Sequence, residues 1–116
     1  MRTVPTLGEL ERAVMEALWS ADGAVTAREV QDALAGRELA TTTVLTVLGR
    51  LERKGLVTRE RSGRAHRYRS VASRADHVAE LMRDALDATP DRGAALARFL
   101  GSIPDDERAA LRDLLD

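Results

Sequence analysis

The chain has 116 residues, of which 44% are hydrophobic and 32% are charged, and its net charge is -1. This length accommodates one compact domain, or a small domain with an oligomerisation appendage. The absence of cysteine excludes disulfides and thiolate metal sites. No signal peptide and no apolar run of membrane-spanning length is visible, so we expect a soluble, cytoplasmic protein without membrane insertion.

Charge is segregated along the chain. Residues 39–74 carry nine basic and two acidic side chains, a net charge of +7. Residues 1–38 carry four basic and seven acidic side chains, and residues 75–116 carry five and ten. A basic segment with acidic flanks suits a polyanionic partner that is confined to one face. On charge alone, a solvated charged surface stays open as the alternative.

Two amphipathic segments precede the basic region. Apolar residues at helical spacing predict a first helix over residues 7–20. Thr26 and Glu29 have the spacing of a capping box, which predicts the start of a second helix. We expect Gly36 to end it.

A third helix is predicted from Thr41 or Thr42 to Lys54, with Gly55 as its stop. Its apolar residues recur at i, i+3, i+4 and i+7 and form one face: Val44, Val47, Leu48 and Leu51. The opposite face carries hydroxyl and guanidinium groups: Thr43, Thr46, Arg50 and Arg53. Threonine is a poor helix former, but its hydroxyl can bind phosphates and base edges. We assign helix capping to Thr41 and nucleic-acid contact to the later threonines.

A basic hairpin follows. A strand is predicted from Leu56, a turn at residues 62–63 and a return strand over residues 65–70. In these two strands Tyr68 occupies an even-numbered position, whereas four arginines occupy odd-numbered positions: Arg59, Arg61, Arg67 and Arg69. Two helices, a recognition helix and a basic hairpin form the order of a winged helix-turn-helix, whose wing lies on phosphates or in a minor groove. The expected fold is mainly α with a small β wing, and the winged-helix DNA-binding domain spans residues 1–72.

Residues 73–116 are predicted to form a tail of three helices. Ser73 and Asp76 form another capping box, and Pro104 opens the last helix. About 40 residues are too few to bury these apolar stripes as an independent core. We therefore expect a homodimer rather than a tail folded back on its own winged helix. The expected interface residues are Leu81, Leu96, Phe99, Leu100, Leu111, Leu114 and Leu115.

Three parts of the chain together resemble the BlaI/MecI/CopY family of penicillinase-type repressors: LGELERAVMEALW, ATTTVLTVLGRLERKGLVTRERSGRAHRYRS and the helical tail. The shared motifs are E-x-x-V-M-x-x-L-W, T-T-V-x-T-x-L-x-R-L, K-G-L-V and a G-R-x-x-x-Y wing. This resemblance implies a dimeric winged-helix repressor that binds palindromic operator DNA. In that family the operators precede β-lactamase or related resistance genes.

Carried onto matching positions, the resemblance implies contacts from the recognition helix and the wing. The recognition-helix contacts would be Thr42, Thr43, Thr46 and Arg50, to which the helix periodicity adds Arg53. The wing contacts would be Arg61, Arg64, His66 and Arg67. The chain departs from the family at Thr41, where an aromatic residue is common, and at Ser70, where proline is common.

The resemblance also bears on induction. The copper-responsive branch of the family uses clustered cysteines, which this chain lacks. In the β-lactam branch, a membrane sensor-protease pathway leads to cleavage in the dimerisation tail before an aromatic residue. Arg98–Phe99 lies at the corresponding place, although its flanking residue differs.

The sequence shows no pattern of catalytic or metal-binding residues. His66 and His77 have no metal-ligand partner at useful spacing, and no cysteine nucleophile or glycine-rich phosphate loop is present. We therefore predict no catalytic residue, metal or cofactor, and no enzyme. A winged helix used only for protein contacts and a regulator that senses a small molecule stay open as alternatives.

Overall fold

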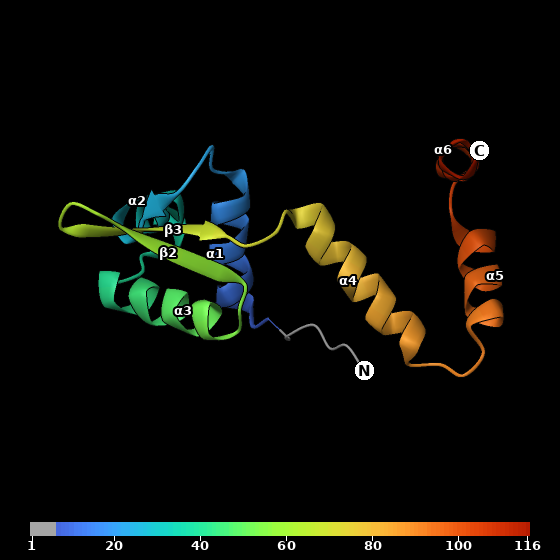
Figure 1. The fold of residues 1–116 in the computed structure, drawn as a ribbon, viewed down its shortest axis with the longest axis horizontal. Helices are drawn as coiled ribbons and strands as arrows, with labels where there is room; N and C mark the ends of the chain where they lie inside the picture. Colours follow the sequence, from blue (N-terminus) through green and yellow to red (C-terminus); the bar gives the residue numbers. More distant parts are fainter. Residues whose placement is uncertain (1–6) are drawn as a thin grey trace.

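The computed structural model describes residues 7–116 and shows a winged helix followed by a helical tail (Figure 1). The first part contains α1 (Glu9–Ser20), β1 (Val25–Thr26), α2 (Ala27–Ala33), η1 (Ala35–Arg37), α3 (Thr41–Arg53), β2 (Val57–Ser62) and β3 (Ala65–Ser70). The tail contains α4 (Arg74–Asp87), α5 (Arg92–Ser102) and α6 (Asp105–Leu115). The predicted fold class, mainly α with a small β wing, is confirmed.

Local capping explains where two of the helices begin. The Thr26 hydroxyl accepts a hydrogen bond from the Glu29 amide at 3.1 Å, and the Thr26 amide donates to Glu29 at 3.0 Å. Ser73 and Asp76 form the same reciprocal pair at the start of α4. Both predicted capping boxes are therefore confirmed. The second helix ends at Ala33, earlier than predicted, because the chain tightens into η1.

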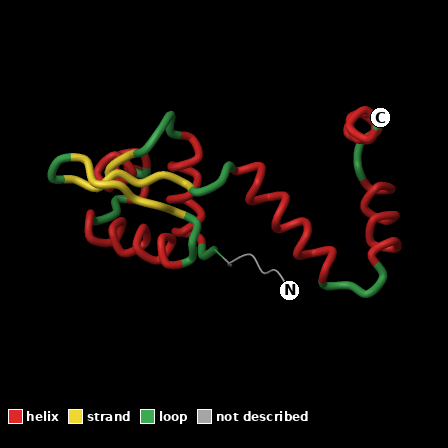
Figure 2. Tube along the Cα trace, in the orientation of Figure 1, coloured by secondary structure: helices red, strands yellow, loops and turns green. Residues whose placement is uncertain are grey.

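The three strands form an antiparallel sheet in the order β1-β3-β2. The hairpin of β2 and β3 pairs Val57 with Ser70 at its base and Ser62 with Ala65 at its tip. Gly63 turns the chain there with φ +66°, a left-handed conformation that glycine adopts without steric cost. Figure 2 shows this hairpin extending past the helices as the wing.

The core lies between α1, α2, α3 and the inner face of the wing. The four α3 residues predicted to face inward are at most 3% exposed. They pack with buried residues of the other elements: Val14, Met15, Leu18, Val30, Val57 and Tyr68. The helical period of α3 therefore fixes which of its side chains remain outside.

The tail extends away from the winged helix (Figures 1 and 2). No residue within α4, α5 or α6 is buried, and Ile103 between α5 and α6 is the buried apolar residue of the tail. The radius of gyration is 17.7 Å, whereas a compact domain of this length has about 13 Å. Across residues 7–116, none of the helices combines the length and apolar character needed to cross a membrane.

Candidate nucleic-acid interface

The outward face of α3 is defined by its buried stripe. With 100° per residue, the side opposite the core-facing residues carries Thr42, Thr46, Gly49 and Arg53, and Leu45 lies on the flank away from Arg50. Arg50 is exposed and lies on one flank of this face, and the half-buried Thr43 lies on the same flank. Sequence periodicity identified the hydroxyls and guanidiniums but missed Leu45 and Gly49. Their positions on the helical wheel were the signal that could have found them.

The threonines at the start of α3 have different roles. The prediction that Thr41 caps the helix is wrong, because Thr41 already lies in the first turn and Ala40 is the N-cap residue. Its hydroxyl donates instead to the Gln31 side-chain oxygen at 2.7 Å, which ties α3 to α2. The Thr46 hydroxyl donates to the Thr42 carbonyl at 2.9 Å. Within residues 7–116 the Thr42 and Thr43 side chains make no hydrogen bond, so they are available to a ligand.

Most basic side chains of residues 39–74 are paired with carboxylates. The pairs are Lys54–Glu11 (2.8 Å), Arg59–Glu52 (3.3 Å), Arg67–Glu29 (3.4 Å), Arg69–Glu60 (3.5 Å) and Arg74–Glu16. Within the described residues, the side chains of Arg50, Arg53 and Arg64 form no hydrogen bond or ion pair. Arg61 donates only to the Gly63 carbonyl in its own turn, at 3.2 Å. The uncompensated positive charge is thus concentrated on the outward side of α3 and at the wing tip.

The strand register divides the wing arginines between two faces. Arg59 lies opposite Tyr68, and Arg61 lies opposite His66. Directly opposed residues share a face of a sheet, so these residues lie on the side of the buried Tyr68. The Arg59–Glu52 pair confirms that this side faces α3. The wing therefore turns Arg61 and His66 toward the side of the recognition helix.

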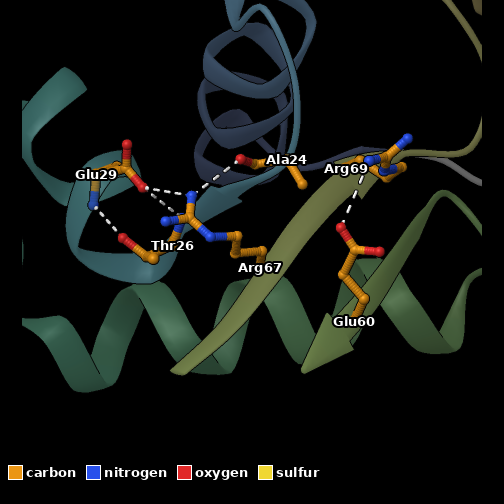
Figure 3. Close-up of polar contacts among 6 residues, drawn as sticks. All are labelled: Ala24, Thr26, Glu29, Glu60, Arg67 and Arg69. Carbon is orange, nitrogen blue, oxygen red and sulfur yellow. Dashed lines mark hydrogen bonds and ion pairs between the residues drawn. The ribbon is translucent and has the colours of Figure 1, made fainter. Parts of the chain in front are cut away.

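Arg67 and Arg69 lie on the other face of the wing (Figure 3). Arg67 donates to the Ala24 carbonyl at 3.3 Å and to Glu29 at 3.4 Å. Arg69 pairs with Glu60 on the neighbouring strand. The four odd-numbered arginines of the wing therefore do not form a single row. The register pairs odd-numbered residues of β2 with even-numbered residues of β3, so the odd-numbered residues of the two strands lie on opposite faces. The structure does not bring Arg67 together with the other predicted contact residues.

An ion pair between a buried glutamate and an exposed lysine holds the end of α3 on α1. Glu11 is only 9% exposed and accepts two hydrogen bonds from the Lys54 ammonium, at 2.8 and 2.9 Å. The Gly8 amide also donates to Glu11, at 2.9 Å. The Gly8 hydrogen bond, the Lys54 ammonium and the charge of Arg50 lower the Glu11 pKa below its ordinary value of 4.5, with burial opposing them. Sequence reasoning missed this pair, although Glu11 is the one carboxylate on the apolar stripe of α1.

Across residues 7–116, no group of three or more histidine, aspartate or glutamate side chains could hold a metal ion. The exposed polar residues of α3 and the wing tip carry hydroxyl and guanidinium groups. Such groups bind phosphate oxygens and base edges in the grooves of duplex nucleic acid.

Comparisons with known proteins agree with this geometry. Residues 7–116 match the family described as Penicillinase repressor. The transcriptional regulator BlaI of Mycobacterium tuberculosis is 50% identical over 119 aligned positions, which cover 99% of this chain and 86% of that protein.

Two solved structures are also similar. The Bacillus licheniformis BlaI monomeric form, in complex with the blaP half-operator, has a TM-score of 0.53 and 26% identity, covering 66% of this chain and 93% of that one. A MarR family protein from Bacillus stearothermophilus has a TM-score of 0.52 over 94% of this chain and 70% of its own, and its 24% identity shows the fold alone. The predicted resemblance is confirmed: this chain belongs to the penicillinase repressor family of transcriptional regulators.

Proposed function

We propose that this protein represses transcription as a homodimer that binds palindromic operator DNA. The main support is the distribution of basic side chains without a carboxylate partner. Five basic residues of the 39–74 segment are paired with carboxylates, whereas within residues 7–116 Arg50, Arg53 and Arg64 are not. In this proposal α3 enters the major groove, as the recognition helix of a winged helix does. The wing tip then lies along the phosphate backbone.

The contacts divide by chemistry. Thr42, Thr43, Thr46, Arg50 and Arg53 are placed on or beside the outward side of α3, so they face base edges and the adjoining phosphates. Arg61, Arg64 and His66 lie at the wing tip, within reach of the backbone. Arg67 has a positioning role in this proposal, since its bonds to Ala24 and Glu29 hold the wing against β1 and α2.

The exposed apolar surface of the tail supports the dimer. Six of the seven predicted interface residues are between 42% and 87% exposed: Leu81, Leu96, Phe99, Leu100, Leu114 and Leu115. The seventh, Leu111, is half-buried. Apolar surface on this scale is a liability in a monomer and is typical of an association surface. We therefore assign residues 1–72 to DNA binding and residues 73–116 to dimerisation. A two-fold dimer then requires inverted half-sites one helical turn, or a multiple of it, apart.

The family and the half-operator complex of the Bacillus protein support a β-lactamase or related resistance gene as the target. Induction through a membrane sensor-protease pathway would require a cut at Arg98–Phe99, which lies inside α5. Both residues are exposed, and α5 has no buried residue to hold it closed. Local opening of this helix costs little free energy in a free subunit, whose interface residues are uncovered, so a protease reaches the bond there. The cut would separate Phe99, Leu100 and α6 from the rest of the tail.

The proposal is tested with the full chain and a pool of random duplexes. We expect selection to recover an inverted repeat, sedimentation to show a dimer, and an isolated half-site to bind at least 100-fold more weakly. A promoter that overlaps the selected repeat should be silenced in transcription in vitro, while one with a scrambled repeat stays active. Recovery of no preferred duplex, or binding as a monomer with equal affinity for half and full sites, would overturn the proposal.

A further inference from the structure

One side of the outward face of α3 is apolar. Leu45 is 44% exposed and does not belong to the hydrophobic core or to the residues packed against it. Gly49 follows four residues later, one turn along the same face. Thr42, Thr46 and Arg53 lie beside these two positions, with hydroxyl and guanidinium groups at the centre of the face. The face therefore has an apolar edge next to a row of polar groups.

Gly49 has no role in the fold that explains it. Its backbone is not in the left-handed region, and a Cβ at this position would meet only the Arg53 guanidinium, at 3.6 Å. Glycine in a helix interior is the least favourable residue after proline, so alanine would fit and would stabilise α3. Single exposed leucines are common and need no explanation. A helix-interior glycine beside one, along the edge of a row of hydroxyl and guanidinium groups, indicates a partner that approaches the α3 backbone closely.

We propose that Leu45 and Gly49 read thymine in each half-site, an inference that rests on the proposed DNA binding. The absent side chain of Gly49 lets α3 sit deep in the major groove. Leu45 then packs its methyl groups against the C5 methyl of one thymine, which is the apolar group that the major groove presents. The unpaired Arg50 and Arg53 on the same helix favour a polyanionic duplex over an apolar protein partner as the occupant of this face.

The first test removes the methyl group from the DNA. A selected operator is prepared with thymine or with deoxyuridine at each position of both half-sites, and binding of the full chain is measured. We expect each half-site to contain one position at which uracil weakens binding, by about fourfold for each thymine that is replaced. Leu45→Ala should abolish this difference at that position, whereas Val71→Ala, which shortens an exposed side chain between β3 and α4, should keep it.

The second test separates stability from binding. Gly49→Ala should raise the melting temperature by about 4–8 °C, since it removes a helix-interior glycine. The same variant should bind the operator about tenfold more weakly or worse, because the added methyl group overpacks the interface. The matched control is Gly36→Ala in η1, where an added Cβ meets no atom within 4 Å and which lies outside α3 and the wing, so it should leave the operator affinity unchanged.

The outcomes distinguish this inference from the proposed function. If the wild-type chain binds its operator, yet uracil equals thymine everywhere and Leu45→Ala matches the wild type, the thymine contact is wrong and DNA binding stands. If Gly49→Ala binds the operator as tightly as the wild type, the close approach of α3 is wrong. If the wild-type chain selects no duplex, the proposed function itself fails.

Discussion

The salt dependence of operator binding tests the division between free and paired basic residues. Four arginines per subunit have no carboxylate partner within residues 7–116: Arg50, Arg53, Arg61 and Arg64. If each neutralises one phosphate, a dimer neutralises about eight, and the logarithm of the binding constant should fall with the logarithm of salt with a slope of about -7. Affinity should then drop about 10⁴-fold between 50 and 200 mM salt.

A different slope is expected if the paired basic residues also contact phosphates. If the paired bases also replaced counterions, all nine basic residues of the 39–74 segment would count in each subunit. The slope would then approach about -16. The ion pairs seen with Glu11, Glu16, Glu29, Glu52 and Glu60 argue against this, since each paired base is already neutralised locally. Measurement of the slope therefore reports which basic residues face the DNA.

Two variants assign the slope to positions. Arg64→Ala at the wing tip removes two contacts per dimer, so the slope should become shallower by about 1.8, on operator and random duplex alike. Arg69→Ala on β3 is the matched control. The Arg69 guanidinium is paired with Glu60, and both residues lie on the face of the wing that is turned away from α3. Titration of a fluorescent duplex at several salt concentrations gives the slopes. A wild-type slope near -16, one shallower than about -3, or equal effects of the two variants would refute the reasoning.

Three further predictions concern base reading, the dimer and stability. Arg50→Ala should weaken operator binding by about 1–3 kcal/mol more than it weakens binding to random duplex, and quantitative gel shifts with both duplexes would expose an equal loss on each. Phe99→Asp should convert the dimer into a monomer in sedimentation and lower operator affinity about 10²–10⁴-fold; a dimer of full affinity would rule out this interface. Glu11 has a lowered pKa, so its contribution to folding is complete above pH 4.5 and is lost as the pH falls through the folded-state pKa. Glu11→Gln should therefore lower the urea midpoint at neutral pH. The variant should also lack the part of the fall in folding stability at acid pH that comes from protonation of Glu11. An unchanged midpoint would mean that the Lys54 pair is not stabilising.

Local patterns in the chain were sufficient for much of the fold. The capping boxes at Thr26 and Ser73, the apolar period of α3 and the turn at Gly63 depend on residues a few positions apart, so they can be read without tertiary structure. Family motifs in α1, α3 and the wing likewise predicted the class of protein correctly. The excess of basic residues in the 39–74 segment pointed to the surface that we assign to DNA.

Tertiary structure decided which of those charges are free. The Glu11–Lys54 pair joins residues 43 positions apart, and no local pattern specifies that contact. Strand register placed Arg61 toward α3 and Arg67 away from it, although both have the same parity in the chain. Thr41 bonds to Gln31 of α2 rather than to its own helix. Pairings of this kind depend on how separate elements pack, so side chains of one type acquire different roles only after the chain has folded.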